Sequence, residues 1–400
     1  MHPSKDIYCS KSEKLRDKKI VVGVTGSIAT VETIKLIREL IRHGAEVFPV
    51  MTKNAQKLVH PDTLQFASGK KTITEITGDV EHVSFCGDVK DKADLLLIAP
   101  CTANTISKIA NGVDDTTVTT FATTAIGSGI PVLIVPAMHI SMYNHPIILG
   151  NIRKLEKIGV NFIEPRMEEK KAKMPNVEEI VENIIRKTGK NDLRNKKILI
   201  ISGPTSEEID DVRGITNRSS GKTGIELAKN AFERGADVKL WYGNGTEKVP
   251  DYVETERFVS AKDLEKKIKE LKYDIIVVCA AISDYTIKKY DGKIPSGKKE
   301  IILKLKPSPK IIKIIRKNFK GFLAGFKLES HISREKLLEK SYKYLKENSL
   351  DLIVANDIKN VKPDKNEVII VDKKRNVIIV KDKKERIAER ILDTIAREMK

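Results

Sequence analysis

The chain has 400 residues, with 73 Lys and Arg against 55 Asp and Glu, so its formal net charge is +18. Because domains usually hold ~100–200 residues, we expect two domains, each large enough to bury its own core. The 40% hydrophobic content excludes a disordered basic tail. The four cysteines are widely spaced and form no CxxC pair, which excludes a disulfide framework and a cysteine-built zinc site.

The basic excess is unevenly distributed along the chain. Residues 1–190 hold 26 basic and 22 acidic residues, a net charge of +4, whereas residues 191–400 hold 47 and 33, a net charge of +14. Such an excess fits nucleic acid, a membrane surface or small phosphorylated ligands as partners. Aromatic residues make up only 5% of the chain, which argues against a binder of single-stranded nucleic acid.

We expect no targeting segment and no membrane span. Residues 1–19 are polar and charged and lack the apolar stretch of a secretory signal. The longest apolar runs, at 94–100 and 131–136, have the length of strands, while a membrane helix needs ~20 apolar residues. We therefore predict a cytoplasmic protein without a membrane partner.

The first half of the chain alternates between strand and helix patterns. Residues 19–25 form a short β-branched run typical of a buried strand, and apolar residues then recur at helical spacing over 28–42. Further strands are predicted at 45–51, 95–99, 132–135 and 160–163, and further helices at 103–111 and 116–127. This alternation predicts a doubly wound parallel sheet.

The middle of the chain is predicted to separate two domains. Residues 164–175 are predicted to form a charged loop, a helix follows, and residues 187–196 have the composition of a linker. The opening pattern then restarts, because the apolar run and glycine of 197–203 parallel those of 19–26.

We therefore expect two tandem Rossmann-like α/β domains, 1–190 and 191–400, each with three layers and a mainly parallel sheet.

Two glycine turns follow predicted strands, where parallel sheets bind ligands and backbone N–H groups approach anions. The first turn, at 24–29, has Gly23 and Gly26, but Ala29 stands in place of a third glycine. A single phosphate is therefore favoured over a dinucleotide. An ordinary strand–helix turn is the alternative.

The second glycine turn, at 217–224, combines two serines, two glycines and a lysine before an apolar helix. Successive N–H groups of this kind form a cradle for oxyanions. Gly221-Lys-Thr matches the end of a Walker A motif, but Thr216 stands where that motif needs glycine. We therefore predict a phosphate loop of another kind, with a surface turn as the alternative.

Four motifs stand in order in the first half: Gly26-Ser-Ile-Ala, His82 in Glu-His-Val-Ser-Phe, Ala99-Pro-Cys-Thr-Ala-Asn-Thr-Ile, and Pro136-Ala-Met-His-Ile-Ser-Met-Tyr143. With these motifs the first half resembles the flavin-containing cysteine decarboxylases.

The second half carries five further motifs: Gly203-Pro-Thr, Asp211-Val-Arg-Gly-Ile-Thr-Asn217-Arg-Ser-Ser-Gly, Ala280-Ala-Ile-Ser-Asp-Tyr285, Gly325-Phe326 and Leu352-Ile-Val-Ala-Asn-Asp357. They resemble the phosphopantothenate–cysteine ligases. The fused pair, over about residues 19–398, is similar to the bifunctional enzymes of coenzyme A biosynthesis.

The resemblance implies two reactions. The second domain would activate the carboxylate of 4′-phosphopantothenate with CTP, release pyrophosphate, and let the amine of cysteine displace CMP from the acyl-cytidylate. The first domain would then decarboxylate 4′-phospho-N-pantothenoylcysteine to 4′-phosphopantetheine with FMN, which supplies the electron sink that the cysteine unit lacks. Mg²⁺ is expected to arrive with the CTP phosphates, without a dedicated protein site. The sequence leaves CTP or ATP open.

In the first domain the resemblance implies that His82 acts beside the substrate thiol, since imidazole titrates near neutrality. A surface or capping histidine is the alternative. His139 stands where the family usually has asparagine, and His139 and Met142 are implied to hold the substrate. The implied FMN-binding residues are Gly26, Ser27, Ile28, Thr52, Thr102, Ala103, Asn104, Thr105 and Thr123.

The resemblance implies no residue of this chain as the proton donor in the decarboxylation. The family's mobile clamp usually carries a cysteine, whereas the matching segment here, residues 168–175, contains none. Cys101 lies in the flavin motif, but we expect it to be a small buried residue.

In the second domain Asn217 resembles the asparagine that handles the acyl-nucleotide intermediate, and Asp284 with Lys293 resembles a nucleotide-contacting pair. For Lys293, a solvated basic face beside Lys288 and Lys289 is the alternative. The implied substrate- and nucleotide-binding residues are Gly203, Thr205, Arg213, Ser219, Ser220, Gly221, Ala280, Asp284, Ser308, Pro309, Lys310, Ile311, Phe326, Lys343 and Lys346.

The partners expected from the resemblance are 4′-phosphopantothenate, cysteine and CTP, with no nucleic acid. A homo-oligomer is implied, built from trimers of the flavin domain and dimers of the ligase domain, with a dodecamer as one such assembly. Two alternatives stay open: a ligase fused to a flavin-binding domain without decarboxylase activity, and a basic nucleic-acid-binding protein. We expect much of the positive charge, such as the run Lys381–Arg386, to be solvated helix surface.

Overall fold

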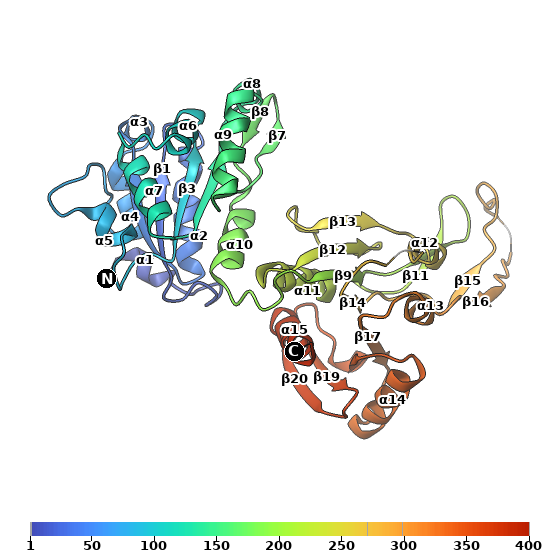
Figure 1. Cartoon of the computed structure of the whole chain (residues 1–400). Helices are drawn as coiled ribbons and strands as arrows, with labels where there is room; N and C mark the ends of the chain where they lie inside the picture. The colour runs from blue at the N-terminus through green and yellow to red at the C-terminus, as the bar shows by residue number, and fades with distance from the viewer. Residues whose placement is uncertain (1, 270, 298, 400) are drawn as a thin grey trace. The chain divides into compact units, whose positions relative to one another are not determined.

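A computed structural model describes residues 2–269, 271–297 and 299–399 (Figure 1). The chain divides into two compact units, Met1–Lys190 and Asn191–Lys400. In the described residues, the helices are too short or too polar to cross a bilayer.

The first unit is built on a five-stranded parallel sheet with the strand order β2-β1-β3-β4-β6. Its strands are β1 (Lys19–Val24), β2 (Glu46–Met51), β3 (Leu95–Cys101), β4 (Val132–Pro136) and β6 (Asn161–Phe162). All residues of β3 and β4 are buried, as expected for parallel strands covered on both faces. The strand positions predicted from the apolar runs agree with these strands.

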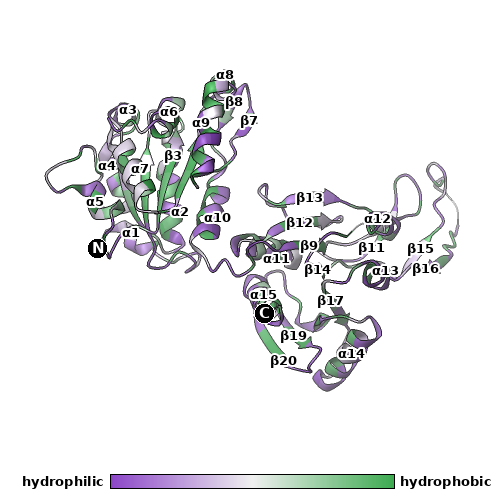
Figure 2. Cartoon of the chain, viewed as in Figure 1, coloured by the Kyte–Doolittle hydropathy of each residue, from purple (hydrophilic) through white to green (hydrophobic). Residues whose placement is uncertain are grey.

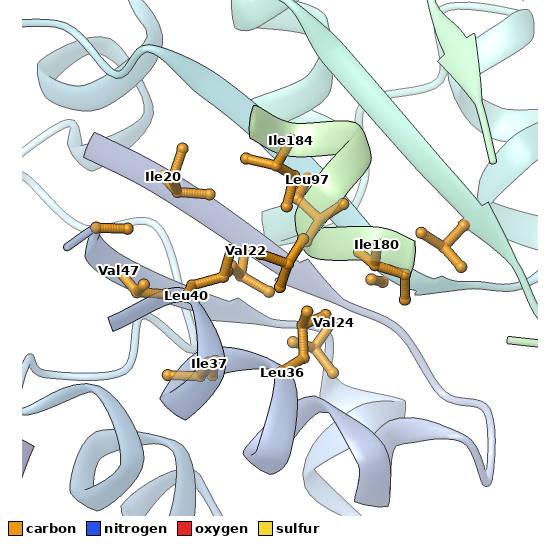
Figure 3. Packing of buried hydrophobic residues seen from close by; sticks show 14 of the residues in the cluster. Ile20, Val22, Val24, Leu36, Ile37, Leu40, Val47, Leu97, Ile180 and Ile184 are labelled. Carbon is orange, nitrogen blue, oxygen red and sulfur yellow. The ribbon is translucent and has the colours of Figure 1, made fainter. Parts of the chain in front are cut away.

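Helices cover both faces of this sheet, so the unit has three layers. One face packs against α2 (Thr30–Arg42), α4 (Pro61–Ser68) and α10 (Val177–Thr188); Figure 3 shows Leu36, Leu40, Ile180 and Ile184 meeting strand residues there. The other face packs against α5 (Glu81–Cys86), α6 (Ala103–Ala110), α7 (Thr117–Gly127) and α9 (Pro146–Lys157). Short helices complete the unit: α1 (Pro3–Asp6), α3 (Lys53–Gln56) and α8 (Ile140–Tyr143).

The predicted charged loop at 164–175 is wrong in part, because it contains a β-hairpin. Strands β7 (Arg166–Glu168) and β8 (Lys171–Lys173) pair antiparallel, and β8 also pairs with β5 (Met138–His139). Glu169 and Lys170 form the turn with φ of 50° and 59°. Turns of this kind normally use Asn or Gly, so the sequence lacks the usual hairpin signal.

The second unit contains an eight-stranded sheet with the order β13-β12-β9-β14-β17-β18-β19-β20. Neighbouring strands from β13 through β18 are parallel to each other. The pairs β18–β19 and β19–β20 are antiparallel. These strands are β9 (Lys197–Ser202), β12 (Asp237–Tyr242), β13 (Glu254–Arg257), β14 (Ile275–Val278), β17 (Phe322–Glu329), β18 (Leu352–Asp357), β19 (Lys365–Asp372) and β20 (Val377–Lys383). Two small antiparallel pairs accompany them: β10 (Ser206–Glu208) with β11 (Gly214–Thr216), and β15 (Tyr285–Ile287) with β16 (Leu305–Pro307).

This unit also has three layers. Helices α11 (Lys222–Glu233) and α15 (Lys384–Glu398) cover one face, and α12 (Ala261–Lys267), α13 (Ile311–Asn318) and α14 (Arg334–Glu347) cover the other. A single 3-10 turn, η1 (Ile358–Asn360), follows β18. In Figure 2 green strands stand out in the first unit, and the helices of both units carry purple as well as green residues, as expected for helices with one polar side. The predicted α/β class with mainly parallel sheets is confirmed.

The segment predicted as a linker is partly structured. Helix α10 continues to Thr188, and Leu193 is buried in the core of the second unit. Arg234, whose side chain is only 6% exposed, forms ion pairs with Asp192 and Asp393. The residues just before β9 therefore pack as part of the second unit.

Candidate functional sites

Two neighbouring loops of the first unit meet at the carboxyl ends of β1 and β3. The strand order reverses between these two strands, and open parallel sheets bind ligands at such a point. The hydroxyl of Thr25 donates to the carbonyl of Pro100 at 2.9 Å, and the N–H of Thr102 donates to the hydroxyl of Thr25 at 3.0 Å. These bonds fix the Gly26 turn beside the start of α6.

The Gly26 turn has the geometry of an anion cradle. A Cβ on Gly26 would lie 2.7 Å from Cβ of Asn54, so no larger residue fits there without movement. Among the described residues, the N–H groups of Gly26 and Ile28 meet no protein acceptor. Ser27 is partly buried beside them, and the side chain of Ile28 is 73% exposed. The residues thus offer free N–H donors and space for a phosphate.

Thr52 and Thr102 each cap a short helix at the same edge of the sheet. The Thr52 hydroxyl accepts from the N–H of Ala55, and the N–H of Thr52 donates to Val24 at 3.1 Å. The Thr102 hydroxyl accepts from the N–H of Thr105. Ala103 and Asn104 form the first turn of α6, whose N–H groups are free of helix partners. Eight of the nine predicted flavin-binding residues therefore gather here.

Thr123 is the exception among these nine residues. It lies on the exposed side of α7, six residues beyond Thr117, whose hydroxyl donates to the carbonyl of Met51 at the end of β2. Six residues of helix correspond to about 9 Å along the axis. The single chain therefore does not bring Thr123 to the Gly26 turn.

His82 and His139 occupy different surroundings. His82 lies in the first turn of α5, and its Nδ1 atom is buried without a hydrogen-bond partner in the described part of the chain. His139 is exposed in β5, opposite Lys171 of β8, so strand pairing holds the β7–β8 hairpin beside it. Met142 follows in α8 and is also exposed. The structure does not bring His82 into hydrogen-bond contact with His139 or the Gly26 turn.

In the second unit a cavity of about 760 Å³ lies at the carboxyl ends of β9, β14 and β17. The strand order of the sheet reverses between β9 and β14, so this cavity lies at the expected ligand position. Ten predicted residues line it: Asn217, Ser219, Ser220, Gly221, Ala280, Asp284, Pro309, Lys310, Ile311 and Phe326.

The loop before α11 is held rigidly at the cavity wall. The carbonyl of Ser220 accepts from the hydroxyl of Tyr242 at 2.8 Å and from the N–H of Thr246 at 3.1 Å. Gly221 has φ of +80°, and a Cβ there would lie 2.5 Å from the Tyr242 ring. Glycine is therefore required by both backbone conformation and space.

Asn217 and Thr205 join this loop to the segment after β14. The side-chain amide of Asn217 donates to the carbonyl of Ala281 at 3.0 Å. Thr205 is fully buried; its hydroxyl accepts from the N–H of Ser283, and its carbonyl accepts from the hydroxyl of Thr216. Thr205 therefore positions both loops without lining the cavity itself.

The opposite wall carries an ion pair. Lys310 donates to the carboxylate of Asp284 at 2.6 Å, and the backbone N–H of Ser308 donates to the carbonyl of Asp284. The hydroxyl of Ser308 is buried without a partner in the described residues. Gly203 packs behind the loops, where a Cβ would lie 3.0 Å from the N atom of Gly243.

Two sequence families cover the two units. The family described as Flavoprotein matches residues 9–189, and the family described as DNA/pantothenate metabolism flavoprotein C-terminal domain matches residues 193–399. The coenzyme A biosynthesis bifunctional protein CoaBC of Thermococcus kodakarensis is 47% identical over 402 residues, covering 99% of each chain. This chain belongs to the CoaBC family.

A second relative agrees with this assignment. The CoaBC protein of Methanocaldococcus jannaschii is 40% identical over 407 residues, covering 100% of this chain and 98% of that protein. A crystal structure of the C-terminal domain of a CoaBC protein is 30% identical, covers 52% of this chain and 98% of that one, and has a TM-score of 0.44. CoaBC membership confirms the resemblance inferred from the motifs.

Four residues predicted for the CoaBC ligase site lie away from the cavity. Arg213 pairs with Asp210 at 3.1 Å, and Lys293 is exposed in the segment between β15 and β16. Lys343 is exposed and lies 3.9 Å from Glu347, while the ammonium of Lys346 lies over the ring of Tyr342. The single chain does not bring these four side chains to the CoaBC cavity.

Other side chains that the motifs did not assign line the cavity instead. They are Lys222, Lys327, Lys362 and Lys384 with Tyr344 and Asn356. Lys222 and Asn356 belong to the motifs at 217–224 and 352–357, whereas Lys327, Lys362, Lys384 and Tyr344 carry no local signal.

Lys384 is an exception to the expectation that the run Lys381–Arg386 is solvated, because Lys381, Lys383 and Arg386 are exposed. It is buried, with 8% of its surface exposed. It precedes Ile387, Ile391 and Ile395 at helical spacing, so the apolar face of α15 places it inward.

Burial raises the pKa of the Cys279 thiol at the cavity wall to about 12. Burial likewise raises the pKa of the Cys101 thiol, whose side chain is completely enclosed beside the flavin motif. Reactive cysteines are accessible and have lowered pKa values. Cys279 is therefore not activated as a nucleophile, and Cys101 fits the expectation of a small buried residue.

Proposed function

We propose that the second unit ligates cysteine to 4′-phosphopantothenate in the 760 Å³ cavity. A carboxylate oxygen attacks the α-phosphorus of CTP, the bond to the β-phosphate breaks, and pyrophosphate leaves. The amine of cysteine then attacks the acyl carbon and displaces CMP. The observation that carries the proposal is that Asn217, the Ser219–Gly221 loop and Asp284 line one cavity.

The side chains around the cavity suit this chemistry. The Asn217 amide is fixed by Ala281 at the junction of two loops, where it can bind the acyl-phosphate group. The N–H groups of Ser220 and Gly221 and the nearby lysines suit phosphate oxygens. Mg²⁺ would be carried by the phosphates, since this ion is usually bound through substrate phosphates and water.

We further propose that the first unit binds FMN and decarboxylates the ligated product. The Gly26 turn with Ser27 would hold the FMN phosphate, and Thr52 and Thr102–Thr105 would border the flavin. When bound, flavin supplies the electron sink for loss of CO₂. The partly exposed imidazole of His82 can exchange a proton with the substrate thiol, and His139 can donate a hydrogen bond to its carboxylate.

Both reactions are tested by incubating the full chain with phosphopantothenate, cysteine and Mg²⁺, and with CTP, ATP, GTP or UTP in turn. We expect pyrophosphate release that is fastest with CTP and requires the carboxylate substrate. We expect CO₂ release to follow, and the purified protein to be yellow with a flavin spectrum. Absence of pyrophosphate with every nucleotide would contradict the ligase.

A separate measurement distinguishes decarboxylation by the first unit from flavin binding alone. The hairpin that matches the family's clamp contains no cysteine, which favours a flavin-binding module without decarboxylation as the second candidate. Yellow protein that releases pyrophosphate but no CO₂ would support that candidate. His82→Asn should abolish CO₂ release and leave pyrophosphate release unchanged, because it lies in the other unit.

We also propose that the enzyme acts in the cytoplasm as a homo-oligomer, trimeric through the first unit and dimeric through the second. The 73% exposed Ile28 beside the Gly26 turn and the exposed Met142 support a covering subunit. Light scattering on the eluting full chain measures the mass. A monomer at micromolar concentration would contradict the proposal.

A further inference from the structure

Lys384 is a largely buried lysine at the wall of the second unit's cavity. It is 8% exposed and lies at the first position of α15. Its backbone N–H donates to the carbonyl of Asp364 at 2.8 Å, but its side chain has no carboxylate or other acceptor partner among the described residues. A buried charge without a partner is costly, so an anion at this position would be strongly favoured.

The charged groups around Lys384 are of both signs. Lys222 of α11 also lines the cavity, and its ammonium pairs with Asp364. Glu226 of α11 and Glu247, after β12, also act on Lys384. The pKa of Lys384 is nevertheless lowered, first by burial and then by the positive charge of Lys222. The acidic groups nearby therefore do not compensate for its burial.

The neighbouring backbone adds hydrogen-bond donors. Gly221 and Lys222 begin α11 at the same cavity, and the Ser220 carbonyl is turned away toward Tyr242. Because the C=O and N–H of one peptide point in opposite directions, the Gly221 N–H is directed away from Tyr242. Helix N-termini of this kind bind phosphate groups.

The other cavity lysines contrast with Lys384. Lys310 pairs with Asp284, and Lys327 lies 3.3 Å from Glu329, so both charges are compensated within the protein. Lys362 is exposed to solvent. Lys384 is thus the buried cavity lysine whose charge depends on a ligand, in the part of the chain that the structure describes.

We propose that Lys384, with Lys222 and the Gly221 N–H, binds a phosphate group of a substrate in this cavity. The inference rests on the proposed ligase function, which supplies two sources of phosphate. These are the triphosphate of the nucleotide and the 4′-phosphate of phosphopantothenate. Lys384 is then a substrate-binding residue that recognises a phosphate. The negative charge of the bound phosphate balances the positive charge of Lys384.

Lys384→Met tests the proposal in the full chain, because methionine keeps the length of the side chain and removes its charge. We expect Lys384→Met to weaken calorimetric binding of either CTP or phosphopantothenate by about tenfold or more, the loss of one charge-assisted hydrogen bond. Binding of unphosphorylated pantothenate should not change. Lys384→Arg should retain most of the affinity. Lys383→Met is the matched control, since Lys383 is exposed and does not line the cavity.

The two sources of phosphate give different results. A loss confined to CTP and inorganic pyrophosphate assigns Lys384 to the triphosphate. A loss for phosphopantothenate but not for pantothenate assigns it to the 4′-phosphate. Binding of CTP, pyrophosphate and phosphopantothenate within twofold of wild type would overturn the proposal.

Unfolding measurements on Lys384→Met show whether the variant is folded. Without ligand, Lys384→Met should unfold at a higher urea concentration than wild type, because a buried unpaired charge has been removed. The increase in melting temperature that the wild type gains from CTP or from phosphopantothenate, whichever loses affinity in the variant, should shrink. If the wild type binds pyrophosphate through Lys384 but ligates no cysteine, the phosphate site stands and the proposed function fails.

Discussion

Among single residues, glycines that lack a Cβ atom matter as much for the shape of the second unit's cavity as the side chains that are present. Gly221 lets the loop pass the Tyr242 ring, and Gly224 lets α11 approach β9, where a Cβ would lie 2.1 Å from the Ser202 hydroxyl. Thr205 fixes two loops from behind. Side chains that never touch a ligand therefore determine the shape of the cavity.

Gly221→Ala is expected to destabilise the second unit by roughly 2–4 kcal/mol, because it adds a strained left-handed residue and a clash with Tyr242. Urea unfolding of the full chain measures the change. Gly127→Ala, at the end of α7, is the control, since a Cβ there meets no atom within 4 Å and its φ is not positive. Equal stability of the two variants would contradict this account of Gly221.

At the scale of elements, the end of β18 is organised by one carboxylate. Asp357 accepts hydrogen bonds from the N–H groups of Lys359, Ile332 and His331 at 3.0, 2.9 and 3.2 Å. These bonds join η1 and the segment after β17 to the strand. They also lower the pKa of Asp357 to about 2, with the Lys359 N–H as the largest cause and the Lys359 charge adding to it.

The lowered pKa of Asp357 predicts a pH dependence. An unfolded aspartate titrates near pH ~4, so the stabilisation is complete above that pH and is lost as the pH falls from about 4 to about 2. Asp357→Asn should lower the urea midpoint of the second unit at pH 7 and flatten its decline over that range. Asp291→Asn, at an exposed carboxylate, is the control. An unchanged acid profile in Asp357→Asn would contradict the assignment.

The turn of the β7–β8 hairpin contains a lysine in the left-handed conformation. Lys170 has φ of 59°, which glycine adopts more easily, whereas Lys171 is extended in β8. Lys170→Gly should stabilise the hairpin by up to about 1 kcal/mol and slow amide exchange in β7 and β8. Lys171→Gly should speed that exchange. Faster exchange in Lys170→Gly would show that the turn has another conformation.

In the whole molecule, each unit has its own core and its own reversal of strand order. The order in the first sheet is β2-β1-β3-β4-β6, while the parallel part of the second is β13-β12-β9-β14-β17-β18. The tandem units therefore differ in topology although their opening sequences are similar. The net charge of +14 in residues 191–400 coincides with the unit whose cavity has lysines in its wall.

The boundary between the units can be tested with two fragments. Residues 191–400 should fold, whereas residues 197–400 should be less stable by about 3 kcal/mol or more. The shorter fragment loses the buried Leu193 and leaves Arg234 without Asp192. Urea unfolding of the two fragments measures the difference. Equal midpoints would show that residues 191–196 are only a connection.

The sequence by itself determined the alternation of strands and helices, the two glycine turns and the family motifs, because these depend on neighbours within a few residues. Strand order, the β7–β8 hairpin and the burial of Lys384 were decided by tertiary structure. Lys384 looks like any lysine in the run Lys381–Arg386 until α15 packs on the sheet and turns it inward. Conversely, Lys343 and Lys346 lie near the right motif, but α14 directs them elsewhere and brings Tyr344 to the cavity. Which charge meets a ligand depends on helix rotation against distant strands, and local sequence does not encode that rotation.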